Sequence, residues 1–329
     1  MTVEPEDDRL HVPEPDDASF RDAVTFAFGD PAAKLYGLAR VSHGIDGSGG
    51  LAVLYAGDKP VAASAGGAGA GAGLGARAAG ASAVGADAGR GTGAAGAGAD
   101  PPTWDSVRAA GVHATVVEPL EAWTVTYADE GGAMDLRFEA CSAPAAIDAD
   151  AAVARTGGMQ GYDQICRVTG TASHGGRTHQ VRCLGQRGQL WGNPDWGRIE
   201  LSRTVSAWLD DDRAVTLTAV RPAKSKGHLD EALGGFLFEG GEPVEIAEPR
   251  LSTTYDGELH QRRAGLELWM SDEDERGHRM AGEVLCGTSI DLGEQRLDSA
   301  FFQWRMEGRT GVGRYDVLRR TEVPGRKRR

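Results

Sequence analysis

The sequence predicts an all-β fold, built as an antiparallel barrel or sandwich, and three observations support this prediction. Short runs rich in aromatic and β-branched residues recur along the chain, with Gly, Asp or Pro residues between them. In the clearest runs apolar and polar residues alternate, as they do in strands with one buried face. No convincing long amphipathic helix interrupts the series. Many short strands joined by turns are typical of antiparallel barrels and sandwiches.

Six strands are predicted in the first half of the chain. Their length and their flanking turn residues favour strands over helices. A small, acidic and Ala-rich segment at residues 144–156 follows them, and it is the predicted domain boundary, with room for a short helix. The six strands are expected at residues 23–28, 35–41, 51–55, 114–117, 122–127 and 134–138.

An Ala/Gly-rich segment separates the third and fourth of these strands. Residues 62–100 contain no aromatic residue and almost no large aliphatic side chain that a core could bury. Frequent glycine raises the entropic cost of ordering the backbone, so helix is not expected despite the alanines. The segment is therefore predicted to be a disordered insertion in a loop of the first domain.

A hairpin is the clearest local feature of the second half. Residues 162–171 and 178–184 flank a Gly-Gly turn, which is typical of a tight β-hairpin. With Gly175 and Gly176 in the turn, Val168 lies opposite Cys183. One face then carries mainly apolar side chains and the other mainly polar ones, as in a half-buried sheet.

The rest of the second half continues the strand pattern to the end of the chain. A length of 329 residues suggests two domains, expected at residues 1–150 and 157–320, with a short basic tail at 321–329. The further strands are predicted at residues 199–208, 214–221, 235–238, 251–255, 264–270, 281–288, 300–307 and 311–318.

Charge and composition exclude several classes of partner. The formal net charge of -13 argues against nucleic acid, which is bound through Lys and Arg. No apolar run approaches the length of a transmembrane helix, and an acidic N-terminus lacks the features of a secretory signal, so we expect a cytoplasmic protein. The four cysteines are scattered, without a CxxC pair, and are expected to be reduced. The oligomeric state is left open.

Three short motifs carry a resemblance to a known family. They are the run from Tyr162 to Thr171, the pair Gly176-Arg177, and the pattern Gly185-x-Arg187-x-x-x-Trp191-Gly192. Together they resemble the carotenoid 1,2-hydratase (hydroxyneurosporene synthase) and AttH-like superfamily. The resemblance implies two lipocalin-like β-barrels in tandem and an enzyme that acts on a terpenoid or other lipophilic substrate in a barrel cavity, without a redox cofactor.

The sequence departs from the family pattern at one functionally important place. The family carries an Asp-His pair just before the Trp-Gly, and these positions are Gly188 and Gln189 here. Histidine moves protons near neutral pH, whereas a Gln amide only donates and accepts hydrogen bonds. An acid–base role of the family histidine therefore does not transfer to this chain.

The stretch from Gly185 to Trp196 provides the candidate ligand-binding residues. Trp191 and Trp196 are expected to form apolar walls, and Arg187 to bind a carboxylate or keto group. An alternative is that both indoles are core anchors and that Arg187 forms a structural ion pair. Gln189 would orient the ligand. Tyr162 and Gln164, on the neighbouring strand, are secondary candidates for the cavity lining.

Two carboxylic acids are candidates for a catalytic acid. Hydration of an alkene needs a desolvated acid to protonate carbon, and Asp195 or Glu200 lies close to the Trp residues. Asp195 follows Asn193-Pro194 and could instead close an Asx turn. No metal site is expected, because His174 and His179 flank a turn without a third ligand.

Three functional interpretations remain open from the sequence. The first is the hydratase-like enzyme on a lipophilic substrate. The second is a non-catalytic, lipocalin-like protein that binds a hydrophobic small molecule, which the missing Asp-His pair favours. The third is a structural protein whose cavity its own side chains fill.

Overall fold

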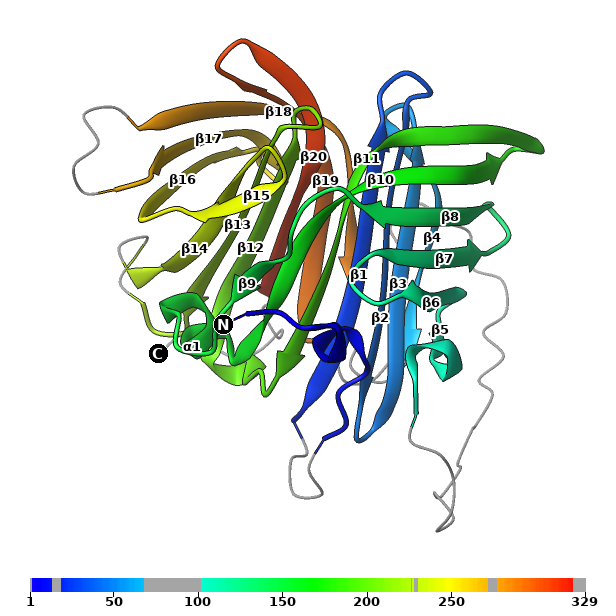
Figure 1. Cartoon of the computed structure of the whole chain (residues 1–329), viewed down its shortest axis with the longest axis horizontal. Coiled ribbons are helices and arrows are strands. Elements are labelled where there is room, and N and C mark those ends of the chain that lie inside the picture. Colours follow the sequence, from blue (N-terminus) through cyan, green and yellow to red (C-terminus); the bar gives the residue numbers. More distant parts are fainter. Residues whose placement is uncertain are drawn as a thin grey trace.

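The computed structural model describes residues 2–13, 19–67, 102–225, 227, 230–271 and 277–321. It confirms the all-β prediction: two large antiparallel sheets curl into two nearly closed barrels that lie side by side (Figure 1). Most of the predicted insertion, together with most of the predicted basic tail, lies outside the described residues. Residues 62–67, predicted to belong to the insertion, instead form the end of a strand.

The first sheet has the strand order β4-β3-β2-β1-β11-β10-β8-β7-β6-β5, with β9 paired to β10. The edge strand β5 packs back against β3 and β4, which brings the two edges of the sheet together. The strands are β1 (Arg21–Asp30), β2 (Leu35–Gly44), β3 (Gly47–Ala56), β4 (Lys59–Gly67), β5 (Arg108–Ala109), β6 (Val112–Glu118), β7 (Ala122–Ala128), β8 (Gly132–Ala140), β9 (Ala145–Ile147), β10 (Met159–His174) and β11 (Arg177–Gly192).

The second sheet has the order β15-β14-β13-β12-β20-β19-β18-β17-β16. As in the first sheet, its first strand in the chain pairs with its last, since β12 pairs with β20 and β1 pairs with β11. The strands are β12 (Ile199–Trp208), β13 (Arg213–Pro222), β14 (Ala232–Glu239), β15 (Glu242–Glu245), β16 (Glu248–Tyr255), β17 (Gln261–Trp269), β18 (His278–Asp291), β19 (Gln295–Met306) and β20 (Arg309–Arg320).

The predicted hairpin has the register expected from the Gly-Gly turn. Val168 pairs with Cys183 and Gly170 with Val181. Gly175 and Gly176 both have positive φ, as a tight hairpin turn requires. The hairpin is longer than predicted, because β11 runs on to Gly192 through the stretch that was expected to be a strand exit.

The division between the sheets lies later in the chain than the predicted domain boundary. Residues 144–156 contain β9 and most of the short helix α1 (Ala152–Gly157), but β10 and β11 return to the first sheet and pair with β8 and β1. The chain enters the second sheet only at β12. The reason is topological: the last two strands of the first sheet complete it beside its first strand, so a composition shift before them does not end it.

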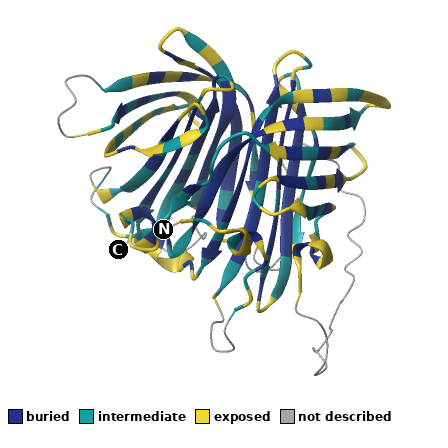
Figure 2. Cartoon of the chain, in the orientation of Figure 1, coloured by how far each residue is buried: buried dark blue, intermediate teal, exposed yellow. Residues whose placement is uncertain are grey.

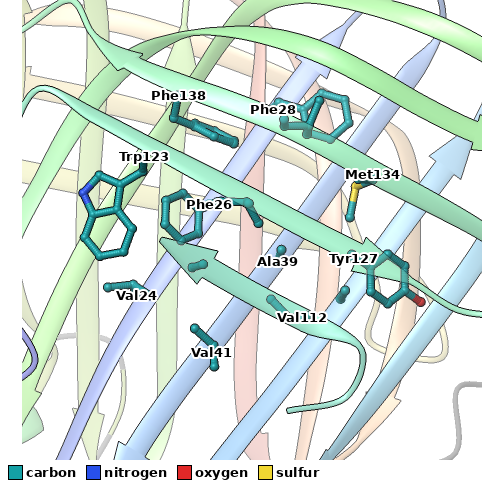
Figure 3. Packing of buried hydrophobic residues seen from close by; sticks show 14 of the residues in the cluster. Val24, Phe26, Phe28, Ala39, Val41, Val112, Trp123, Tyr127, Met134 and Phe138 are labelled. Atoms are coloured by element: carbon teal, nitrogen blue, oxygen red, sulfur yellow. The ribbon is translucent and has the colours of Figure 1, made fainter. Parts of the chain in front are cut away.

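Each barrel has its own apolar core, and a third apolar layer lies between the barrels. In the first barrel Phe26 packs against Trp123 and Phe138 (Figure 3). Between the barrels, Phe301 of the second sheet contacts the rings of Tyr36 and Tyr55 of the first. The central strands are therefore buried on both faces, whereas the outer ends of the hairpins are exposed (Figure 2).

Candidate functional site

A cavity of about 190 Å³ lies between the two sheets. It is slightly larger than the cavities of about 150 Å³ that accept benzene in protein cores. We call it the inter-sheet cavity. Its lining comes from both sheets, from α1 and from the segments that join them: Thr25, Leu38, Arg40, Ser42, Gly50, Leu51, Ile147, Val153, Ala154, Gly157, Met159, Asp163, Gly188, Leu190, Trp196, Ile199, Ser202, Thr204, Thr218, Val220, Leu292, Gln295, Leu297, Arg314, Asp316 and Leu318.

Two rows of cross-strand partners place polar groups in this cavity. In the first sheet Arg40 pairs with Thr25, Thr25 with Gly188, and Gly188 with Asp163. The row thus crosses four neighbouring strands, β2, β1, β11 and β10. Because cross-strand partners point to the same face of a sheet, all four residues face the second sheet. This explains how residues far apart in the sequence meet at one wall.

The second sheet contributes a matching row. Thr218 pairs with Thr204, Thr204 with Asp316, and Asp316 with Ser299. The carboxylate of Asp316 accepts a hydrogen bond of 2.7 Å from the Ser299 hydroxyl and lies 3.3 Å from an Arg314 nitrogen. Arg314 also lines the cavity. The two barrels therefore enclose a space with a polar part, while Leu, Ile and Val side chains supply much of the remaining wall.

Asp163 has the environment of a carboxyl group that favours protonation. It is buried, and one of its oxygens accepts a hydrogen bond of 2.5 Å from the amide of Gln186. Burial raises the pKa of Asp163, because desolvation disfavours the charged form, and the attraction of Arg314 and the Gln186 hydrogen bond offset this only in part. The pKa of Asp316 is raised for the same first reason, against the opposing effect of Arg314.

Gly188 leaves the space that the Asp163 carboxyl group occupies. A Cβ atom at position 188 would lie 2.4 Å from Oδ1 of Asp163, well inside van der Waals contact. A glycine at this position is therefore required by the packing of the Asp163 side chain. A carboxyl group reaches the cavity from the strand directly opposite.

The structure places five of the predicted ligand-binding residues away from this cavity. Arg187, Gln189 and Trp191 of β11 point into the first barrel, as do Tyr162 and Gln164 of β10. Successive residues of a strand point to opposite faces, so the cavity receives the intervening residues Asp163, Gly188 and Leu190 instead. These side chains therefore belong to the interior of the first barrel.

Arg187 forms a buried ion pair with the N-terminal segment. Its guanidinium lies 2.7 Å from a carboxylate oxygen of Asp8, donates to Gln164 at 2.6 Å and sits over the rings of Trp123 and Tyr162. Asp8 also accepts hydrogen bonds from Tyr162 and from the indole of Trp123. The alternative of a structural ion pair thus describes Arg187, and its partner is Asp8.

Gln189 and Trp191 contact the same N-terminal segment. The side-chain amide of Gln189 donates to the buried carboxylate of Asp22 at 2.9 Å. His11 contacts the same carboxylate through its ring Nδ1 at 2.9 Å, and its ring stacks on Trp191 at 4.1 Å between centroids. Trp191 is therefore a packing anchor at the mouth of the first barrel.

The last three predicted residues lie where β11 leads into β12. Trp196 is 38% exposed and lines the inter-sheet cavity. Asp195 is exposed and accepts a hydrogen bond of 3.0 Å from the backbone N–H of Gly197, as in an Asx turn. Neither Asp195 nor Glu200 belongs to the cavity lining.

Sequence reasoning missed Arg40, Asp163, Arg314 and Asp316. Asp163 and Asp316 lie in strands whose two faces are both buried, so simple alternation between a core face and a solvent face does not identify them. An available signal was a charged residue inside an otherwise apolar strand, such as Arg40 between Leu38 and Val41. Buried charged groups need a partner or a function.

The described residues contain neither a grouping suited to a metal ion nor a helix suited to a membrane. No group of three or more His, Cys, Asp or Glu side chains there is placed to hold a metal ion. Among the helices of the described residues, none has both the length and the apolar character needed to cross a membrane.

A family model described as "Domain of unknown function (DUF7064)" matches residues 84–321. No curated protein sequence matches the chain significantly. Several solved structures are similar. A protein assigned as AttH from Nitrosomonas europaea has a TM-score of 0.61 at 11% identity, with 96% of each chain covered.

Two further structures share the fold. CghA, solved with Sch210972, has a TM-score of 0.59 at 10% identity, with 93% of this chain and 90% of that chain covered. Kievitone hydratase from Nectria haematococca has a TM-score of 0.55 at 7% identity, with the same coverage of 93% and 90%. At these identities the similarity shows a common fold.

Proposed function

We propose, from the premise that the chain belongs to the DUF7064 family, that it is a hydratase-like enzyme acting on a small lipophilic alkene in the inter-sheet cavity. A terpenoid is the favoured substrate class. The most specific substrate that we propose is an acyclic carotenoid, whose end group would enter the cavity. The observation that carries the proposal is a buried carboxyl group, Asp163, with a raised pKa in a cavity with largely apolar walls.

The similar structures support this choice of reaction without fixing the substrate. One is named a hydratase, and CghA was solved with a small organic molecule. Both share the fold over nearly the whole chain. A cavity between two barrels is also a favourable location for such a ligand, because pockets commonly form where two structural units meet.

The chemistry requires only a proton and a water molecule. Protonated Asp163 would transfer its proton to one alkene carbon, and the electron pair of the double bond would form the new C–H bond. Water would then add to the carbocation and lose a proton to the Asp163 carboxylate, which restores the acid. The product is the alcohol, and the apolar walls would shield the carbocation from other nucleophiles.

Trp196 would assist the same step. Its indole lines the cavity, and an aromatic face stabilises a nearby cation by about 0.5–2 kcal/mol. The same cavity would serve the second candidate function, a protein that binds a hydrophobic small molecule without converting it. The absence of the family Asp-His pair at Gly188 and Gln189 favours that alternative.

Turnover by an Asp163→Asn variant tests the proposal. Wild-type protein is incubated with an acyclic carotenoid and with a smaller acyclic terpene, and the product one water heavier is measured by mass spectrometry. Asn cannot supply the proton, so D163N should lose about 10²- to 10⁴-fold in rate. Asp195→Asn, an exposed carboxylate outside the cavity, is the matched control and should keep the wild-type rate.

Three results would decide between the candidates. Equal product from D163N and wild type would remove Asp163 from the mechanism. Loss of activity in D195N alone would identify Asp195, at the junction between β11 and β12, as the catalytic acid. Tight binding of either molecule without any product would favour the binding protein.

A further inference from the structure

We infer that the ligand of the inter-sheet cavity carries a carboxylate, and that the guanidinium of Arg40 binds it. This inference rests on the proposed function in one respect, that the cavity holds a small lipophilic molecule. It adds the chemical group by which such a molecule would be oriented. The substrate class becomes lipophilic carboxylic acids, such as terpenoid acids.

Arg40 is a cavity-lining cation without a direct ion pair. Within the described residues its side chain forms no hydrogen bond and no ion pair, although the residue is partly buried, and the carboxylates of Asp316 and Asp22 attract it only from a longer distance. The three arginines that are buried outright all have a carboxylate partner: Arg187 pairs with Asp8, Arg203 with Glu231, and Arg314 with Asp316. Arg40 has no such carboxylate partner, and it lies where a ligand would bind.

The nearest acidic side chains of the cavity are engaged elsewhere. Asp316 is held by Ser299 and Arg314, and Asp163 by Gln186. Burial first, and then repulsion from Arg314, lowers the pKa of Arg40 to about 10, so Arg40 remains protonated at neutral pH. An anionic group from the ligand would relieve both unfavourable effects.

A second donor in the same cavity also lacks a partner. Nε of Arg314 is buried and has no hydrogen-bond acceptor among the described residues. Arg314 and Arg40 both line the cavity and repel each other electrostatically, so an anion in the cavity would be attracted by both. An unsatisfied buried donor is costly, which makes an acceptor from the ligand favourable.

The chemistry of the site selects a carboxylate over larger anions. A guanidinium presents paired N–H donors that match the two oxygens of a carboxylate. The lining contains no lysine, and around Arg40 it offers Leu38, Leu51 and small hydroxyl side chains. A cavity of about 190 Å³ with such walls accepts one small polar group on an otherwise apolar molecule.

Binding of geranic acid and of its methyl ester tests the inference. Isothermal titration at a pH where the acid is ionised should show that wild-type protein binds the acid about tenfold or more tightly than the ester. Arg40→Gln should remove this preference, so that the variant binds the acid no more tightly than the ester. Arg137→Gln removes the same charge from an exposed position of β8 and should keep the preference.

Equal affinity for acid and ester in the wild type would overturn the inference, as would a preference that survives in R40Q. Binding of neither molecule would overturn it together with the cavity proposal. If wild-type protein prefers the acid over the ester and D163N retains full turnover, the inference about Arg40 stands and Asp163 is rejected as the catalytic acid. If R40Q does not fold, Arg40→Lys provides the second readout, since a retained point charge should keep part of the preference.

Discussion

Neighbouring residues of β11 serve two different compartments of the molecule. Arg187 and Gln189 bind the N-terminal segment inside the first barrel, while Gly188 between them faces the inter-sheet cavity. The side-chain period of a strand is two, so a shift by one residue exchanges the compartments. The role of a side chain in β11 therefore depends on the face of the sheet to which it points as much as on its residue type.

Asp163 should make the stability of the protein depend on pH. Its folded-state pKa is raised above the ordinary value of 3.8, so the folded state holds its proton more tightly than the unfolded state does. Its contribution to the free energy of unfolding is therefore most favourable below about pH 3.8 and declines as the pH rises through the raised pKa.

Replacing Asp163 by Asn should remove this decline. Asn retains an oxygen that can accept the Gln186 hydrogen bond but has no charge to desolvate. Urea unfolding from acid to neutral pH should show D163N gaining stability relative to wild type as the pH rises. A constant difference between the two proteins across that range would show that Asp163 does not titrate in this way.

At the scale of elements, the N-terminal segment is a structural part of the first barrel. A 3-10 turn at Pro5–Asp8 places Asp8 against Arg187, and His11 follows to meet Asp22. The segment is far from β10 and β11 in the sequence but contacts both. An acidic N-terminus therefore contains one residue, Asp8, that the fold buries completely.

Asp8→Ala should destabilise the protein by about 3–5 kcal/mol, because it leaves the buried Arg187 without its carboxylate. Glu6→Ala is the control, since Glu6 is exposed and its ion pair with Arg9 at 4.0 Å should contribute about 0–1 kcal/mol. Equilibrium denaturation measures both. Similar small losses for the two variants would mean that the segment detaches readily from the barrel.

At the scale of the whole molecule, the two barrels share an apolar layer and should unfold together. Phe301 lies at the centre of this layer, against Tyr36, Tyr55 and Trp208. The hydroxyl of Tyr55 also donates to the backbone carbonyl of Ser299, across the two sheets. If one barrel unfolded alone, the apolar face that it covers on the other barrel would become exposed to water.

Phe301→Ala should cost about 3–5 kcal/mol through the cavity that it leaves. Calorimetry should show a single transition in the wild type and in the variant, at a lower temperature in the variant. Val117→Ala, at a 48% exposed position, should leave the transition almost unchanged. Two separate transitions in the wild type would show that the barrels fold independently.

Much of the fold follows from local sequence signals. The turn at Gly175 and Gly176 set the register of the β10–β11 hairpin correctly, because positive φ at both positions restricts the turn type. The strands β4, β5, β9 and β15 were missed. The strands β5 and β9 have only two and three residues, too few for a pattern. The Ala/Gly composition of β4 and the Glu/Pro composition of β15 have low strand propensity, so that pairing with a neighbouring strand decides their conformation.

The candidate site was less accessible to sequence reasoning. Trp196 was predicted to be an apolar wall, and the structure places it in the lining of the inter-sheet cavity, while its role in ligand binding stays a prediction. Arg40 and Asp163 were not recognised, since only strand pairing across β1 and β11 places them on the same wall of the cavity. No spacing along the chain expresses that arrangement.

The amino-acid sequence by itself determined that the chain forms antiparallel strands, where most of them lie and how its clearest hairpin pairs, because hydrophobic periodicity and turn residues act over a few positions. Only the tertiary structure decided that β10 and β11 complete the first barrel and that a cavity lies between the barrels. It also decided that Arg187 pairs with Asp8. These features depend on which faces of distant strands meet, and that is fixed by the packing of whole sheets.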